Sequence, residues 1–208
     1  VGRLAPTVYN TRYPTTQDRR SGPKTAMQVN ILEYLENGAA RHHPDKIAVV
    51  DAARSYTFAE LERYAKRCAA LLIRRVDVTC RLIAVFLPKS ANVVFADLGI
   101  VYSGNIYANL DVKSPAQRVK GIIGNIDPVL VVTSRALAPQ LSAIGVPDAT
   151  LFFIEDIEDQ NLQPDGAALW RRLEGVIDTA PLCIIHTSGS TGLPKGVSRR
   201  RWLTRDWD

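Results

Sequence analysis

The chain has 208 residues, of which 46% are hydrophobic, and carries a formal net charge of +5. This composition excludes a disordered protein, because the apolar residues are enough to bury the core of one domain or of a large part of one. Charged or polar residues interrupt every apolar stretch before it reaches membrane-spanning length, as Asp97 does within residues 91–102, so no membrane span is predicted.

Basic residues are concentrated near the two ends of the chain, within residues 1–25 and 198–208. No aromatic face is interleaved with them, so the pattern indicates solvated segments and not a nucleic-acid-binding surface. The cysteines, Cys68, Cys80 and Cys183, are an odd number and include no C-x-x-C pair. They favour neither a disulfide framework nor a zinc site, and a reducing, cytoplasmic setting is the simplest prediction.

In the first part of the chain, residues 1–25 mix Pro, Thr, Arg and Gly without apolar periodicity and predict a loose arm. Helical spacing over residues 26–40 predicts a helix, and the apolar run 47–50 predicts a strand. Thr57 and Glu60 have the spacing of a capping box, so an amphipathic helix is expected directly after Thr57.

The second part alternates apolar runs with helical patterns. Residues 90–102 predict a helix with Gly104 just beyond its end. Ser114 as N-cap and Pro115 at the first helical position predict another helix, ending near residue 125. Buried strands are predicted at residues 82–87, 129–133, 151–154 and 182–186. This alternation predicts an α/β fold with a mainly parallel sheet flanked by helices.

The most informative segment runs from Thr187 to Gly196, where ten positions hold four hydroxyl residues, three glycines and the single lysine Lys195. Glycines let backbone N–H groups approach an anion closely, hydroxyls add neutral donors, and the lysine adds a positive charge. The segment follows the strand predicted at residues 182–186, and α/β sheets bind ligands at the carboxyl ends of strands. The sequence therefore predicts a phosphate-binding loop here.

Three rival interpretations of this loop can be tested by spacing and context. A Walker A loop requires G-x-x-x-x-G-K-[ST], but Pro194 occupies the place of the second glycine and Gly196 that of the hydroxyl residue. A nucleophile elbow requires G-x-S-x-G, and Ser188 replaces the glycine before Ser190. A flexible Gly/Ser linker is disfavoured because an apolar strand directly precedes the loop.

The segment from Thr187 to Gly196 resembles the phosphate-binding signature of the adenylate-forming superfamily, which includes acyl-CoA synthetases, luciferases and the adenylation domains of nonribosomal peptide synthetases. Residues 47–61 are similar to the family's "A-V-V-D … L-T-Y-x-E-L", and residues 104–118 to its "A-G-A-A-Y-V-P-L-D-P … P-x-x-R". Asp111, which matches the aspartate of the latter pattern, is predicted to form a turn or cap.

The resemblance implies that this chain is the incomplete, N-terminal part of the large domain of an AMP-binding enzyme. Residues 26–197 are expected to form the N-terminal portion of an adenylation domain. They would lie between the loose arm 1–25 and a basic tail at 198–208 that is not homologous to the family.

The family's chemistry uses ATP and Mg²⁺ to convert a carboxylate into an acyl-adenylate with release of pyrophosphate. Coenzyme A or the phosphopantetheine of a carrier protein then commonly accepts the acyl group. The resemblance implies nucleotide binding by Thr187, Ser188, Gly189, Ser190, Thr191, Gly192, Pro194, Lys195 and Gly196. These are binding roles, in which Lys195 would neutralise phosphate charge, so no catalytic residue is assigned and the metal ligands remain open.

The chain also departs from the family pattern. Arg201 occupies the position of a family histidine, and the family segments for adenine, ribose and the carboxylate substrate would lie beyond Asp208. Two hypotheses stay open. In one, the chain is the N-terminal portion of an ATP-dependent ligase, inactive alone, with an amino-acid substrate favoured by residues 107–118. In the other, it is a truncated remnant that catalyses nothing, or a weak nucleotide-binding module.

Overall fold

The computed structural model describes residues 31–159, 161–176, 180–187 and 195–200. The helical elements are α1 (Ile31–Tyr34), the π-helical η1 (Leu35–Ala40), α2 (Phe58–Ile73), α3 (Ala91–Tyr102), α4 (Ala116–Ile126), α5 (Ala138–Ala143), the 3₁₀ turns η2 (Asp148–Thr150) and η3 (Ile154–Glu158), and α6 (Gly166–Glu174). The strands are β1 (Ile47–Val50), β2 (Ser55–Thr57), β3 (Leu82–Phe86), β4 (Ile106–Asn109), β5 (Leu130–Thr133), β6 (Leu151–Phe153), β7 (Pro181–Thr187) and β8 (Lys195–Arg200).

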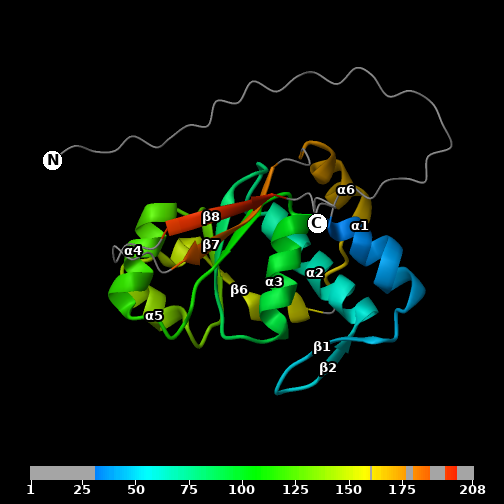
Figure 1. Cartoon of the computed structure of the whole chain (residues 1–208), viewed down its shortest axis with the longest axis horizontal. Coiled ribbons are helices and arrows are strands. Elements are labelled where there is room, and N and C mark those ends of the chain that lie inside the picture. The colour runs from blue at the N-terminus through cyan, green and yellow to red at the C-terminus, as the bar shows by residue number, and fades with distance from the viewer. Residues whose placement is uncertain (1–30, 160, 177–179, 188–194, 201–208) are drawn as a thin grey trace, which may run out of the picture.

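Six of these strands form one sheet in the order β6-β5-β3-β4-β7-β8 (Figure 1). The first five run parallel to one another, and β8 pairs antiparallel with β7 at the edge. At the centre of the sheet, Ile83 of β3 pairs with Tyr107 of β4 on one side and with Leu130 of β5 on the other. The predicted α/β class with a mainly parallel sheet is confirmed.

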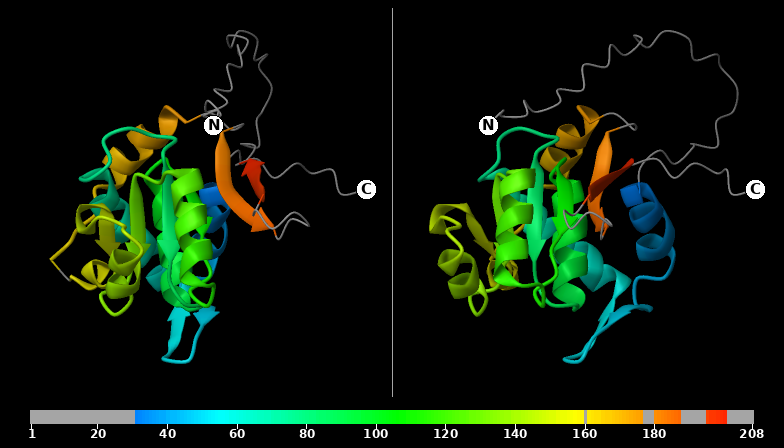
Figure 2. Two further views of the ribbon diagram at one scale, coloured as in Figure 1. Left: turned by 90° about the vertical axis from the view of Figure 1, so that its left-hand side faces the viewer. Right: turned by 60° about the vertical axis from the view of Figure 1, so that its left-hand side comes forward.

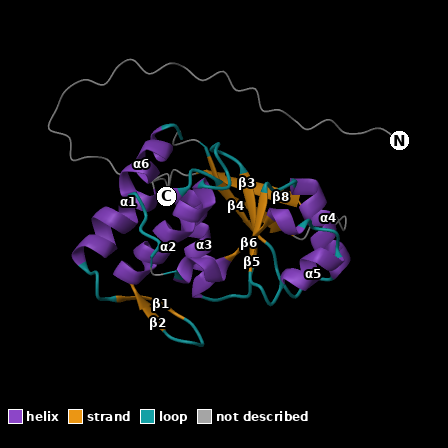
Figure 3. Cartoon of the chain, turned by 180° about the vertical axis from the view of Figure 1, so that it is seen from behind, coloured by secondary structure: helices purple, strands orange, loops and turns teal. Residues whose placement is uncertain are grey.

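Helices cover both faces of this sheet (Figure 3). Alternate residues of a strand point to opposite faces, so Ile83 and Val85 belong to the core beneath α2 and α3, whereas Ala84 and Phe86 belong to the core beneath α4 and α5. Parallel sheets buried on both faces read as continuous apolar runs, which is why β3 and β5 were recognisable in the sequence.

The contact between α2 and α3 depends on a glycine. A Cβ added to Gly99 of α3 would lie 2.5 Å from Cβ of Cys68 on α2, which is closer than atoms of two packed side chains approach. Helix α2 itself begins with the predicted capping box. The Glu60 amide donates to Oγ1 of Thr57 at 3.2 Å, and the Thr57 amide donates to Oε2 of Glu60 at 2.9 Å.

Helix α6, which precedes β7, is fixed by one arginine. The Arg172 guanidinium donates to the carbonyl oxygens of Ser103 at 2.8 Å, Asp77 at 2.8 Å and Val78 at 2.6 Å, and also to that of Val76. These carbonyls lie in the loop between α2 and β3 and just after α3. The arginine therefore ties α6 to the sheet at the point from which the chain enters β7.

Some predicted elements are confirmed and others need correction. The strand predicted at residues 47–50 is confirmed as β1, which pairs with β2 in a separate two-stranded antiparallel sheet that projects from the body (Figure 2). The predicted N-cap Ser114 is wrong by one residue, because Pro115 has the extended backbone of the N-cap and the helix starts at Ala116. Of the helix predicted over residues 26–40, the part from Ile31 is present and becomes π-helical at Leu35.

Candidate functional site

The two described ends of the predicted phosphate-binding segment lie on β7 and β8, which pair as an antiparallel hairpin. In the register of the two strands, Thr187 pairs with Lys195 and His186 pairs with Gly196. The backbones of Thr187, Lys195 and Gly196 are therefore neighbours at one end of the hairpin. The other predicted site residues, Ser188, Gly189, Ser190, Thr191, Gly192 and Pro194, lie outside the described residues.

This end of the hairpin lies at the carboxyl edge of the parallel sheet. Strands β3, β4, β5 and β7 run in the same direction, so their carboxyl ends share one edge, and Thr187 is the last residue of β7. Figure 2 shows the hairpin at one side of the sheet. Open α/β sheets bind ligands outside the carboxyl ends of their strands, so this is the edge at which such a site is expected.

The amino end of α3 lies at the same edge and is already occupied by a carboxylate. Oδ2 of Asp51 accepts the Ala91 amide at 2.9 Å, while Oδ1 accepts the amides of Ala53 at 2.9 Å and Arg54 at 3.2 Å. These backbone hydrogen bonds lower the pKa of Asp51. Asp51 therefore takes up the Ala91 amide, one of the backbone donors that the amino end of α3 would otherwise offer to an anion.

Sequence reasoning did not assign this role to Asp51, although the residue closes the "A-V-V-D" segment. The available signal was its position directly after β1, where a short acidic side chain can accept amides two and three residues ahead. Asp111, in contrast, was predicted to form a turn and does so. Its Oδ1 accepts the Lys113 amide at 2.9 Å, and its carbonyl accepts the Ser114 amide at 3.0 Å.

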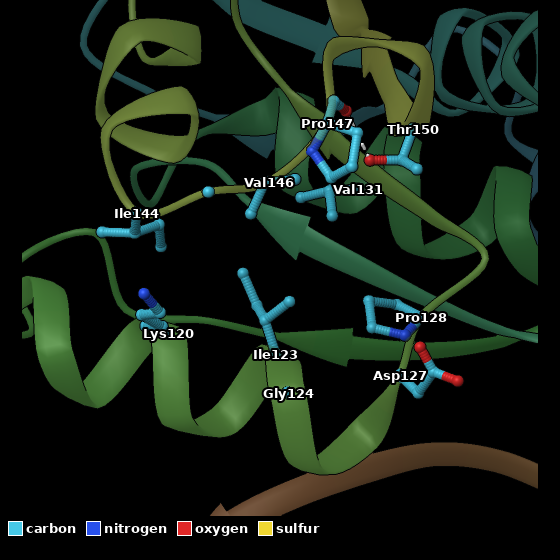
Figure 4. Close-up of a pocket in the computed structure, with 11 residues that line it drawn as sticks. Lys120, Ile123, Gly124, Asp127, Pro128, Val131, Ile144, Val146, Pro147 and Thr150 are labelled. Atoms are coloured by element: carbon cyan, nitrogen blue, oxygen red, sulfur yellow. Dashed lines mark hydrogen bonds between the residues drawn. The ribbon is translucent and has the colours of Figure 1, made fainter.

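A groove of about 340 Å³ lies at the other edge of the sheet, near the amino ends of β5 and β6 (Figure 4). Ile123 of α4 faces Val131 and Val146 across it, with Lys120 and Asp127 toward its two ends. Strands β5, β6 and β7 are parallel, so this groove is separated from the carboxyl end of β7 by the length of the sheet. It is therefore not part of the candidate site.

The described ranges hold no group of three or more His, Cys, Asp or Glu side chains placed to bind a metal ion. In the same ranges, no helix combines the length and apolar character needed to cross a bilayer.

Comparison with known proteins shows that the chain is similar to parts of larger synthetases. It is 33% identical over 182 residues to the AMB antimetabolite synthetase AmbB of Pseudomonas aeruginosa, a match that covers 88% of this chain and 14% of that protein. It is 35% identical over 167 residues to the syringomycin synthase SyrB1 of Pseudomonas syringae pv. syringae, covering 80% of this chain and 26% of that protein. The chain thus spans about a quarter or less of the length of these relatives.

Solved structures of related proteins have the same fold as this chain. The AMPPNP-bound form of the nonribosomal peptide synthetase FmoA3 superposes with a TM-score of 0.68 at 26% identity, covering 84% of this chain and 17% of that one. The N-terminal subdomain of Klebsiella oxytoca NpsA superposes with a TM-score of 0.68 at 17% identity, covering 83% of this chain and 42% of that one. The latter match bears on the fold alone.

The sequence profile described as AMP-binding enzyme matches residues 36–200, which extend from η1 to the end of β8 and include the candidate hairpin. The chain therefore belongs to the AMP-binding enzyme family.

Proposed function

We propose that this chain is the nucleotide-binding, N-terminal portion of an enzyme that activates a carboxylate with ATP, forming an acyl-adenylate and releasing pyrophosphate. The observation that carries the proposal is the pairing of Thr187 with Lys195 at the carboxyl edge of the sheet. This pairing places the two ends of the glycine- and hydroxyl-rich segment side by side, within a region that matches the AMP-binding family.

The residues of this segment fit a triphosphate chemically. Neutral hydroxyl groups and glycine amides can donate to several phosphate oxygens without adding charge, and Lys195 supplies one cation. When a phosphoryl bond is broken, positioning and charge neutralisation carry most of the catalytic effect, so a cradle without a general base suffices for this half of a site. The proposed nucleotide-binding residues are Thr187, Ser188, Gly189, Ser190, Thr191, Gly192, Pro194, Lys195 and Gly196.

The same segment contains no carboxylate. Mg²⁺ prefers oxygen ligands and commonly binds through substrate phosphates, so the ion would arrive with ATP and contact at most a hydroxyl of this loop. The magnesium would neutralise phosphate charge during the reaction. The acyl acceptor, proposed as a thiol of coenzyme A or of a carrier protein, has no assigned residues in this chain.

An amino acid is the favoured carboxylate substrate. The similarity to FmoA3, a nonribosomal peptide synthetase, supports this class, because peptide synthesis joins amino acids. The chain spans 14% and 26% of the lengths of AmbB and SyrB1, so activity of the 208-residue chain by itself is not part of the proposal.

Binding of ATP to the full chain, measured by calorimetry in the presence of Mg²⁺, tests the proposal. Replacing Lys195→Ala removes a hydrogen bond to a charged group, worth about 1.5–3 kcal/mol, so affinity is expected to fall roughly 10- to 100-fold. Lys120→Ala is the matched control, because Lys120 is exposed and lines the separate groove described above. Equal ATP affinity of wild type and Lys195→Ala, or no measurable binding by wild type, would reject the nucleotide role.

A further inference from the structure

A half-buried carboxyl group, with one fully buried oxygen, lies between α3 and the carboxyl end of β4. The Asn109 side-chain amide donates to Oδ2 of Asp97 at 2.9 Å. Oδ1 of Asp97 is buried and, within the described residues, accepts no hydrogen bond. An ionised carboxylate with a buried, unpaired oxygen is costly, whereas the neutral acid avoids most of that cost. The geometry therefore favours the protonated form of Asp97.

Among the residues that the structure describes, the groups that face Asp97 offer no compensating positive charge. They are Cys68 of α2, Tyr107 and Asn109 of β4, and, through Tyr107, Cys183 of β7. Burial raises the pKa of Asp97 to about 7, and the hydrogen bond from Asn109 opposes this rise. The pKa values of Cys68 and Tyr107 are raised mainly by burial, and next by the negative charge of Asp97. Burial therefore disfavours a negative charge on Asp97 by more than the hydrogen bond from Asn109 favours it.

Asp97 and Asn109 are linked to the candidate site through strands β4 and β7. Asn109 is the last residue of β4, and Tyr107 of the same strand pairs with Cys183 of β7, which ends at Thr187. Just beyond Asn109, the Leu110 amide donates to the Val85 carbonyl at 2.8 Å and closes the ladder between β4 and β3. The family pattern has a proline at the position of Asn109, and a proline has no side-chain amide to donate.

We propose that Asp97 and Asn109 are positioning residues, which hold the carboxyl end of β4 against α3 only while Asp97 keeps its proton. When the proton leaves to solvent, the carboxylate draws water into the contact, and the strand end beside the nucleotide hairpin loosens. The effect on nucleotide binding rests on the function proposed above. The contact itself does not, so it can be tested without nucleotide.

The first test is the pH dependence of unfolding of the full chain by denaturant. In the unfolded chain Asp97 ionises near pH 3.9. In the folded chain its pKa is raised to about 7, so the folded state holds this proton more tightly. The protonated Asp97 therefore stabilises the fold at low pH, and this stabilisation is lost as the pH rises toward about 7. Relative to Asp97→Asn, the unfolding constant of wild type is expected to rise up to tenfold per pH unit between about pH 5 and about pH 7.

Asp45→Asn is the matched control, because Asp45 is an exposed carboxylate in the turn before β1, and this variant should follow wild type. Parallel pH profiles of wild type and Asp97→Asn would overturn the proposal.

The second test measures directly whether the carboxyl end of β4 stays in place. Hydrogen exchange of the Leu110 amide, corrected for the intrinsic pH dependence of exchange, should accelerate above about pH 7 in wild type and not in Asp97→Asn. If Asp97→Asn fails to fold, Asn109→Ala replaces it. That variant keeps the acid and removes its donor, so Leu110 exchange should be faster than in wild type below about pH 7 as well. Unchanged Leu110 exchange in the folded variant would contradict the proposal.

Discussion

The α2–α3 layer and the β7–β8 hairpin differ in what supports them. Phe95 and Ile100 of α3 are fully buried against α2 and the sheet, whereas Ile185 of β7 is 48% exposed. The hairpin meets the rest of the described sheet through β4 alone. The part that holds the fold together is therefore distinct from the part that carries the proposed chemistry. Substitutions in the layer should change stability, and substitutions at the hairpin should change ligand binding.

The largest expected effect is the loss of Phe95, at the centre of the layer. Its ring lies 5.0 Å from that of Tyr56 and 4.9 Å from that of Tyr64, centroid to centroid. Phe95→Ala should lower the free energy of unfolding by about 3–5 kcal/mol, as large-to-small substitutions in well-packed cores do. Denaturant unfolding measures it. A loss as small as that of Val50→Ala, at a residue 68% exposed on β1, would contradict the assignment of the core.

The next effect concerns the close approach of α3 to α2. Gly99→Ala places a methyl group against Cys68 and should cost about 1–3 kcal/mol, because neither helix backbone can withdraw without disturbing the core. Gly121→Ala is a matched control, since a Cβ at Gly121 of α4 meets nothing within 4 Å. There, the better helix propensity of alanine should stabilise the chain by up to about 1 kcal/mol. Equal effects of the two substitutions would refute the packing argument.

The capping box gives a smaller effect within the same layer. Thr57→Ala leaves the Glu60 amide at the start of α2 without its acceptor and should cost about 1 kcal/mol. Thr57→Ser, which retains the hydroxyl group, should recover most of that loss. Thermal unfolding of the two variants provides the comparison. Similar losses for both would show that the hydroxyl group does not act as a cap.

The smallest effect is expected in the hairpin. Ile185→Thr should change the stability of this chain by no more than about 0.5 kcal/mol, because the side chain is already half-exposed. The equivalent change in the central strand, Val85→Thr, buries a hydroxyl group at a residue 1% exposed and should cost about 1–3 kcal/mol. If the two costs were equal, the distinction between the layer and the edge would fail.

Local signals made the layer predictable from the sequence. The Thr57–Glu60 spacing and the continuous apolar runs of β3 and β5 act within a few residues, so a single sequence contains them. Strand β4 is partly exposed and ends in the polar Asn109, and β2 contains the polar Ser55 and Thr57, so neither forms a continuous apolar run. That β1 leaves the main sheet to pair with β2 depends on tertiary contacts that periodicity does not encode.

The candidate site was located from the sequence, and its phosphate-binding role stays a prediction. The composition from Thr187 to Gly196 indicated a phosphate-binding loop, and the structure places the two ends of that loop together. The roles of Asp51 and Asp97 were not predicted, because each depends on a partner distant in the sequence. Asp51 accepts the amide of Ala91, and Asp97 meets Asn109 across the interface of a helix and a strand.

The most direct test of the account is hydrogen exchange of the full chain with and without ATP and Mg²⁺, read separately for residues 181–200 and for α2. The account predicts slower exchange in the hairpin on addition of ATP, no change in α2, and loss of the hairpin effect in Lys195→Ala at unchanged stability. Protection that is absent from the hairpin, or that persists undiminished in Lys195→Ala, would contradict the claim that this hairpin binds the phosphates of a nucleotide.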